Sequence, residues 1–211
     1  MATIQGIYAL CDNNLNPGLQ HRDLAERLLA GGVPVLQLRM KGEKDLARVR
    51  AATEAILAFK SRYDFRFILN DFVELAAELP VDGIHLGQDD MDISEARRRL
   101  GPGRLIGYSS HSLEEALAAE RQGADYVALG AIFPTATKGP GHPVQGVETL
   151  RQVAATLQVP VVAIGGIVRE NFSQVVAAGP AAVAMIGALT QAQDIRAEAK
   201  WFVEAFQRLR N

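Results

Sequence analysis

The feature that most constrains the fold is a regular alternation of short apolar runs with longer segments of helical period. The runs, each three or four residues long, are Ile7–Leu10, Val35–Leu38, Phe67–Leu69, Gly83–Leu86, Leu105–Tyr108, Tyr126–Leu129, Val161–Ile164 and Val183–Ile186. Between and after them lie expected helices at Asp23–Ala30, Asp45–Phe59, Leu113–Gln122, Val147–Leu157, Asn171–Ala178 and Arg196–Leu209. About eight strand–helix units in this order predict an α/β fold of the (β/α)₈ barrel type.

An open, doubly wound sheet is the main alternative to the barrel. Such a sheet usually carries a Gly-rich turn after its first strand, whereas Asp12-Asn13-Asn14-Leu15 follows the first run here. The runs are almost continuously apolar, as expected when both faces of a parallel sheet are covered. No linker or low-complexity segment divides the 211 residues, so we expect residues 1–211 to form one compact barrel domain.

Composition excludes several classes of protein and partner. Lys and Arg number 22 against 24 Asp and Glu, a net charge of -2, which argues against binding to duplex nucleic acid but leaves a local phosphate site open. Cys11 is the only cysteine, so neither an intrachain disulfide nor a thiolate zinc cluster is expected. The first residues lack a secretory signal, and the longest uncharged stretch, Asn171–Gln193, contains Gly179-Pro180. We expect a cytoplasmic protein with no membrane partner; a homo-oligomer is possible.

Polar residues gather directly after the apolar runs, where a barrel carries its active site. Gln37, Arg39 and Lys41 alternate at the end of the second run, so one face of the chain carries all three. Later runs are followed by Asn70-Asp71, Gln88-Asp89-Asp90, Ser109, Thr135-Ala136-Thr137-Lys138, Gly165-Gly166 and Gly187. A single loop charge is most often solvated. The coincidence at successive strand ends favours a functional site.

The residue types indicate what such a site binds. Arg39, Lys41 and Lys138 are suited to neutralise a phosphate or diphosphate. Asp71 and Asp90 supply the hard oxygen ligands that Mg²⁺ takes together with a substrate phosphate. The Gly turns after the last two runs stand where barrels often bind phosphate through backbone N–H groups. The sequence therefore predicts sites for two anionic groups.

The four histidines carry less information. His21 and His142 are expected to be exposed, and His85 and His111 are expected to pack or to support other residues rather than act as general bases. No two histidines have metal-ligand spacing, and no Ser-His-Asp arrangement is indicated.

Several segments together resemble the thiamine-phosphate synthase family, in order and over almost the whole chain. They are Gln37-Leu38-Arg39-Met40-Lys41, Asn70-Asp71, Gly83-Ile84-His85-Leu86-Gly87-Gln88-Asp89-Asp90, Pro134-Thr135-Ala136-Thr137-Lys138 and Ala163-Ile164-Gly165-Gly166-Ile167. The resemblance implies an enzyme that joins a hydroxymethylpyrimidine diphosphate to a thiazole phosphate, giving thiamine phosphate and pyrophosphate.

The resemblance also implies roles for individual residues. The pyrimidine diphosphate would be held by Gln37, Arg39, Lys41, Asn70, Ser109 and Lys138, of which Arg39, Lys41 and Lys138 are the catalytic cations. Asp71 and Asp90 would bind Mg²⁺. The thiazole phosphate would be held by Thr135, Thr137, Gly166, Ile186 and Gly187, the last three largely through backbone. The chain departs from the family pattern at Gly187, often Ser, at Phe72, often basic, and at the bulky Tyr108.

The sequence leaves two other functions open. A thiazole tautomerase resembles the synthase in fold and in the segment His111–Glu115, but it needs no metal-diphosphate site and tends to have a His where this chain has Ala131. Lys41, Asp71, Asp90 and Lys138 therefore favour the synthase. A non-catalytic sensor of phosphate ligands would bind ligand without releasing pyrophosphate.

Overall fold

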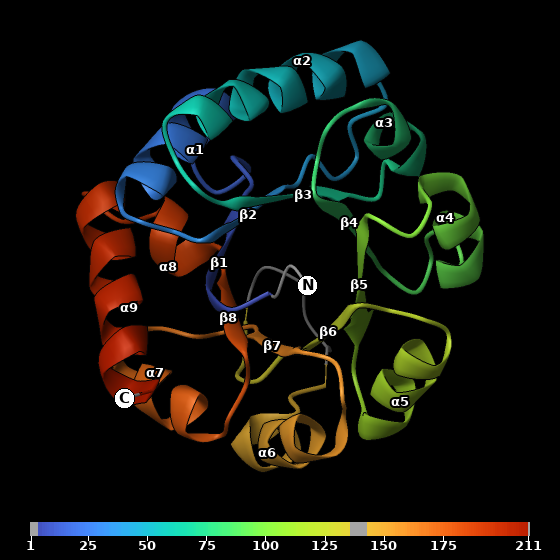
Figure 1. Cartoon of the computed structure of the whole chain (residues 1–211). Coiled ribbons are helices and arrows are strands. Elements are labelled where there is room, and N and C mark those ends of the chain that lie inside the picture. The colour runs from blue at the N-terminus through green and yellow to red at the C-terminus, as the bar shows by residue number, and fades with distance from the viewer. Residues whose placement is uncertain (1–3, 136–142, 211) are drawn as a thin grey trace.

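A closed barrel of parallel strands forms the centre of the molecule in a computed structural model, which describes residues 4–135 and 143–210 (Figure 1). Within those ranges the barrel has eight strands, each paired with the next along the chain, and the last is paired with the first. They are β1 (Gly6–Cys11), β2 (Val35–Leu38), β3 (Arg66–Asn70), β4 (Gly83–Leu86), β5 (Leu105–Ser110), β6 (Tyr126–Leu129), β7 (Val161–Ile164) and β8 (Ala182–Met185). The predicted (β/α)₈ barrel, a single compact domain, is confirmed.

Helices surround the barrel and connect the strands (Figure 1). They are α1 (His21–Ala30), α2 (Leu46–Leu57) with the 3₁₀ turn η1 (Ala58–Ser61), α3 (Val73–Glu78), α4 (Ile93–Leu100), α5 (Leu113–Arg121), α6 (Gly146–Thr156), α7 (Arg169–Ala177), α8 (Gly187–Thr190) and α9 (Ile195–Arg210). The six predicted helices are present, but α3, α4 and α8 were not predicted. They contain only six, eight and four residues, too few to establish a helical period in the sequence.

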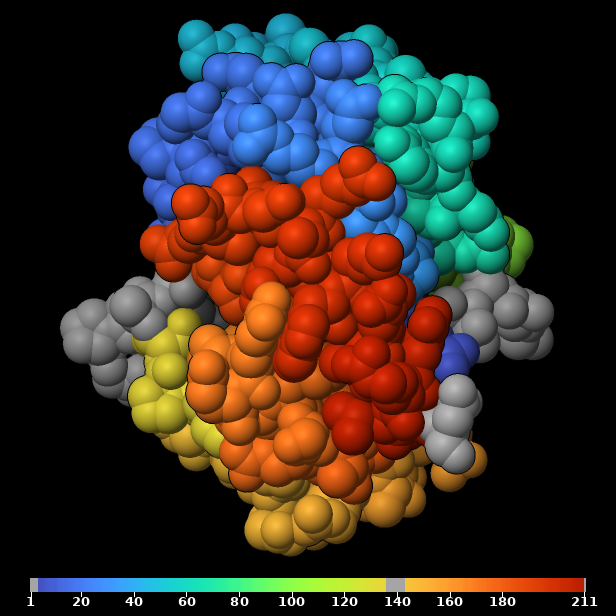
Figure 2. All heavy atoms as spheres, turned by 90° about the vertical axis from the view of Figure 1, so that its left-hand side faces the viewer, coloured from blue at the N-terminus to red at the C-terminus, as the bar shows by residue number. Residues whose placement is uncertain are grey.

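The last helix completes the outer ring. Figure 2 shows the red C-terminal segment between the blue segment that contains α1 and the orange segment that contains α7. Between α7 and α9, the rings of Phe172 and Phe202 meet edge to face with centroids 5.0 Å apart. No helix in the described part of the chain has the length and apolar character needed to cross a membrane.

Each strand buries both of its faces. In β1, Tyr8 and Leu10 point into the barrel and belong to the interior cluster, whereas Ile7, Ala9 and Cys11 pack against the helices. This alternation follows from the two-residue period of a strand. It explains why the runs read as continuously apolar and show no alternation of apolar and polar residues.

One glycine in the barrel makes room for a large interior side chain. Gly107 in β5 pairs with Tyr126 in β6, and a Cβ atom at Gly107 would overlap the Tyr126 ring. Tyr126 is fully buried, so its ring has no free space to move into.

We expect Gly107→Ala to lower the free energy of unfolding by about 2 kcal/mol, as overpacking of a rigid core does. Gly103→Ala is the matched control, because a Cβ atom at Gly103 meets nothing within 4 Å. Urea denaturation followed by circular dichroism measures both. Equal stabilities of the two variants would contradict this account of the barrel interior.

Candidate active site

A cavity of about 450 Å³ opens at the carboxyl ends of the strands. The predicted site residues that line it are Gln37, Arg39, Lys41, Asn70, Asp71, Asp90, Ser109 and Ile186. They come from both halves of the chain. Parallel closure of the sheet brings them together because every strand ends on the same rim.

The remaining predicted residues do not line this cavity or lie outside the described residues. Gly166 follows β7 with a φ of +66°, and a Cβ atom there would lie 2.5 Å from the carbonyl oxygen of Pro134, so the turn requires glycine. Gly187 begins α8, and Thr135 is half-buried beyond β6. Thr137 and Lys138 lie outside the described residues. The thiazole-phosphate role of this group stays a prediction.

Asp71 and Asp90 form a carboxylate pair at the rim. Asp71 adopts a left-handed backbone conformation with a φ of 65°, and its N–H donates to the His85 carbonyl oxygen at 3.1 Å. The Asp90 carboxylate accepts from the N–H of Gly87 at 2.6 Å. Burial, followed by the hydrogen bond and negative charge of Asp90, raises the pKa of Asp71 to about 7. Repulsion between the two carboxylates makes a bound cation favourable here.

The donor set of this pair fits Mg²⁺. Among the described residues, no cluster of three or more His, Cys, Asp or Glu side chains could enclose a metal ion. Mg²⁺ needs no such cluster, because it is usually held by one or two carboxylates together with water and substrate phosphates. Arg39 and Lys41 line the same cavity, so a phosphate bound there would stand beside the pair.

Arg39 is held in place by a residue that sequence reasoning missed. Its guanidinium forms an ion pair with the carboxylate of Asp12, whose side chain is only 3% exposed. Asp12 also accepts a hydrogen bond from the N–H of Asn14 at 2.9 Å. The sequence showed Asp12 only as part of a turn after the first strand. Its contact with Arg39 depends on the pairing of β1 with β2.

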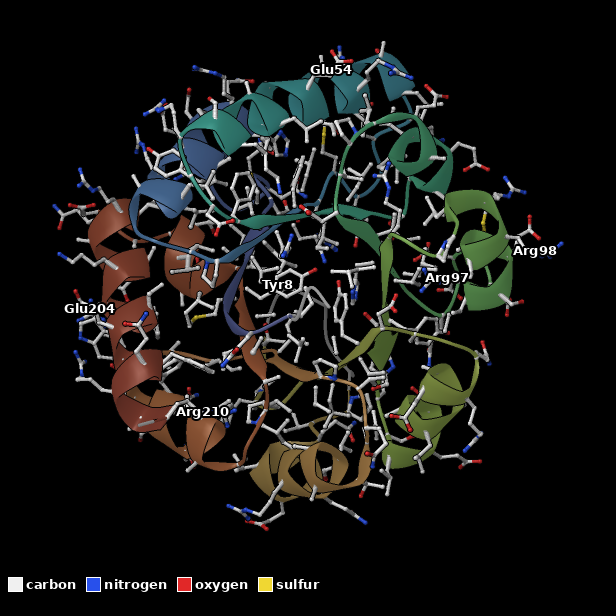
Figure 3. All side chains as sticks on the ribbon, viewed as in Figure 1. Tyr8, Glu54, Arg97, Arg98, Glu204 and Arg210 are labelled. Atoms are coloured by element: carbon white, nitrogen blue, oxygen red, sulfur yellow. The ribbon has the colours of Figure 1, made fainter. Side chains whose placement is uncertain are left out.

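A chain of hydrogen bonds crosses the barrel, and four of its five members line the cavity. Gln37 Nε2 donates to the hydroxyl of Tyr8 at 2.7 Å, and that hydroxyl lies 2.8 Å from the hydroxyl of Tyr126. The Tyr126 hydroxyl lies 3.2 Å from Nδ1 of His85, and His85 Nε2 lies 2.9 Å from Ser109 Oγ. Figure 3 shows Tyr8 at the centre of the barrel. Burial raises the pKa of both tyrosines, so both phenols are neutral.

The structure decides two of the four histidine expectations. His85 is buried, so the expectation that it packs is confirmed. His111 lies at the cavity with Nδ1 3.3 Å from the Glu115 carboxylate. The expectation that His21 is exposed is wrong, because its Nε2 atom is buried with no hydrogen-bond partner among the described residues, and burial lowers its pKa. His142 lies outside the described residues.

Comparison with known proteins identifies the family. The family model described as "Thiamine monophosphate synthase" matches residues 7–189. The chain belongs to this family. The thiamine-phosphate synthase of Chlorobium luteolum is 43% identical over 171 residues, which cover 81% of this chain and 80% of that protein. The thiamine-phosphate synthase of Nitrosococcus oceani is 41% identical over 206 residues, which cover 97% of this chain and 94% of that protein.

A solved structure agrees with this assignment. The thiamine phosphate pyrophosphorylase from Pyrococcus furiosus superposes with a TM-score of 0.90 at 31% identity, covering 98% of each chain. The resemblance to the thiamine monophosphate synthase family read from the sequence motifs is therefore confirmed, together with its barrel fold.

The raised pKa of Asp71 predicts that the stability of the folded protein depends on pH. The folded-state pKa of Asp71, about 7, exceeds its ordinary value of 3.8, so the folded protein holds this proton more tightly than the unfolded chain does. The stability that the proton contributes is present below pH 4 and is lost as pH rises to 7. In EDTA, the wild-type protein should therefore lose about 1 kcal/mol more than Asp71→Asn over this range, a value reduced for solvent screening.

Urea denaturation at several pH values measures this difference. Asp64→Asn, at an exposed acid before β3, is the control and should follow the wild-type curve. Parallel curves for wild type and Asp71→Asn would show that burial and Asp90 do not raise the pKa of Asp71 in the folded protein.

Proposed function

We propose that this chain is a thiamine-phosphate synthase, which joins 4-amino-2-methyl-5-hydroxymethylpyrimidine diphosphate to 4-methyl-5-hydroxyethylthiazole phosphate. The products are thiamine phosphate and pyrophosphate. The observation that carries the proposal is the meeting of two cations, Arg39 and Lys41, with two carboxylates, Asp71 and Asp90, on one cavity. A diphosphate substrate with its metal needs both kinds of group in one place.

Different cavity residues bind the two ends of the pyrimidine diphosphate. Arg39 and Lys41 bind the diphosphate, and Asp12 supports the orientation of the Arg39 guanidinium. Gln37, Asn70 and Ser109 stand on strands β2, β3 and β5 around the same cavity and hold the pyrimidine end. We assign Lys138 to the diphosphate from its sequence motif alone.

Asp71 and Asp90 are the residues that would hold Mg²⁺. When bound, the metal ion supplies positive charge that neutralises the diphosphate oxygens. Proximity of Arg39 and Lys41 places further positive charge at the same rim, and Lys41 is the larger of the two contributions that lower the pKa of Asp71.

The reaction needs charge stabilisation and closeness more than proton transfer. The bond between the pyrimidine methylene carbon and the diphosphate oxygen breaks, and its electron pair leaves with the diphosphate. Arg39 and Lys41 stabilise the charge that accumulates on the departing group. The aminopyrimidine carries the methylene cation, and the thiazole nitrogen donates its lone pair to form the new C–N bond. No proton changes place, so the site requires no strong general base.

The second substrate completes the site. We assign the thiazole phosphate to Thr135, Thr137, Gly166, Ile186 and Gly187, of which Ile186 lines the cavity. Holding both reactants in one cavity supplies the proximity that a two-substrate reaction requires. We further propose that residues 1–211 act as one catalytic domain on these small molecules in the cytoplasm, with neither nucleic acid nor membrane as partner.

Incubation of the purified protein with both substrates and MgCl₂ should yield thiamine phosphate and pyrophosphate in equal amounts, and EDTA should abolish both. Chromatography and a coupled pyrophosphate assay measure the two products. Isomerisation of a thiazole without pyrophosphate would indicate the tautomerase instead. Binding of both ligands without turnover would indicate a sensor.

We expect Asp71→Ala to lower kcat at saturating substrate by about 100-fold or more with Mg²⁺ present, because the metal loses one of its two protein ligands. Asp64→Ala removes an exposed acid just before β3, at the end of that strand away from the rim, and serves as the control with unchanged turnover. Near-normal activity of Asp71→Ala would remove Asp71 from the metal site.

A further inference from the structure

The loop between β1 and α1, residues 12–20, is bonded to two separate parts of the structure, and we call it the β1 loop. At its start, Asp12 forms the ion pair with Arg39, which lines the cavity. Further along, the side-chain amide of Asn16 donates from Nδ2 to the carbonyl oxygen of Thr190 at 3.0 Å. Thr190 is the last residue of α8 and lies 174 positions further along the chain. The reaction as described above gives Asn16 no role.

Thr190 connects Asn16 to the wall of the cavity. Thr190 is fully buried, and its Oγ1 donates to the carbonyl oxygen of Ile186 at 3.1 Å. The backbone N–H of Thr190 donates to the same oxygen at 2.9 Å. Ile186 lines the cavity and is one of the residues that we assign to the thiazole phosphate. A single residue therefore stands between Asn16 and a part of the cavity wall.

The helix α8 depends on contacts from outside because it is short. It contains only four residues, Gly187–Thr190, and a helix of that length is not stable by itself in water. The last carbonyl groups of a helix have no partner within it, and Asn16 supplies a donor for the carbonyl group of Thr190. Leu15 Cδ1 lies 3.6 Å from the position that a Cβ atom at Gly187 would take. The β1 loop thus reaches both ends of α8.

The β1 loop has hydrogen bonds of its own that fix its shape. The side-chain amide of Asn13 donates from Nδ2 to the carbonyl oxygen of Leu19 at 3.1 Å. The backbone N–H of Asn16 donates to the carbonyl oxygen of Asn13 at 3.0 Å, and the N–H of Leu19 donates to that of Asn16 at 3.0 Å. Because the backbone around Asn16 is held in this way, its side chain can hold α8 in one position.

We propose that Asn16 is a positioning residue for the thiazole phosphate. Through α8 it fixes Ile186 and Gly187, which we assign to that substrate. The same loop holds Arg39, at the diphosphate end of the cavity, through Asp12. One loop thereby sets the spacing of the two reactants, on which a two-substrate reaction depends. This inference rests on the proposed function, because the substrates are those of that reaction.

Steady-state kinetics of Asn16→Ala tests this role. We expect the KM for the thiazole phosphate to rise about tenfold, because α8 loses the hydrogen bond that holds its C-terminal end. The KM for the pyrimidine diphosphate should keep its wild-type value, since Asp12 still pairs with Arg39. At saturation with both substrates kcat should also be unchanged, as expected when a variant loses only substrate binding.

Asn13→Ala is the matched control. It removes the same type of side chain from the same loop, but the hydrogen bond that it loses, to Leu19, stays within the loop and does not reach α8. Both KM values of this variant should equal those of the wild type. A merely structural role of Asn16 would lower kcat through a smaller folded fraction and leave both KM values unchanged. That result, or an equal rise of the thiazole-phosphate KM in Asn13→Ala, would overturn the proposal.

Thr190→Val provides a second test that stays decisive if Asn16→Ala does not fold. It keeps the shape of the buried side chain, removes the Oγ1 bond to Ile186 and should raise the same KM. An unchanged thiazole-phosphate KM in this variant would contradict the connection from α8 to the cavity wall.

Calorimetric titration with the thiazole phosphate, in the presence of MgCl₂ and pyrophosphate, measures binding without turnover. Weaker binding by Asn16→Ala and Thr190→Val than by the wild type and Asn13→Ala supports the positioning role. If the wild type then forms no thiamine phosphate, the positioning role stands and the synthase function is contradicted. Equal binding by the wild type and both variants overturns the positioning role even if thiamine phosphate is formed.

Discussion

The pairing of β8 with β1 is the constraint on which the site depends, because it closes a parallel sheet on itself. In a closed parallel barrel every strand ends on one rim, so the loops after the strands surround a single opening. Arg39 after the second strand and Ile186 after the eighth therefore line one cavity. The closed sheet also separates the interior of the barrel from the surrounding helices. Polar side chains inside it must therefore form hydrogen bonds with one another across the barrel.

The interior shows how those partners are found. Buried hydroxyl and imidazole groups cost free energy unless they are hydrogen-bonded, and Tyr8, Tyr126 and His85 satisfy one another in a continuous chain. The chain ends at the cavity on both sides, at Gln37 and Ser109. The hydrogen bonds that satisfy the polar groups inside the barrel thus also reach Gln37 and Ser109, two residues of the cavity wall.

Electrostatics at the rim follows from local placement more than from the net charge of -2. Arg39 interacts with two acidic residues. Its guanidinium forms an ion pair with the buried Asp12, and its positive charge acts to lower the pKa of Asp71. The hydrogen bond and negative charge of Asp90 raise the pKa of Asp71. The rim therefore holds a carboxylate pair suited to a cation next to cations suited to a phosphate. A metal-bound diphosphate matches both.

The sequence by itself determined the barrel and most of the rim, because strand period and the rule that parallel strands end together are local properties. From those two rules alone, Arg39 and Asp71 are predicted to lie at the same end of the barrel, and both line the cavity there. Short helices such as α3 were not predicted, because six residues show no clear helical period. Only the tertiary structure decided that Asp12 holds Arg39 and that Tyr8 meets Tyr126, 118 residues away. Such contacts depend on which strands face each other across the closed barrel, and no local pattern in the chain encodes that geometry.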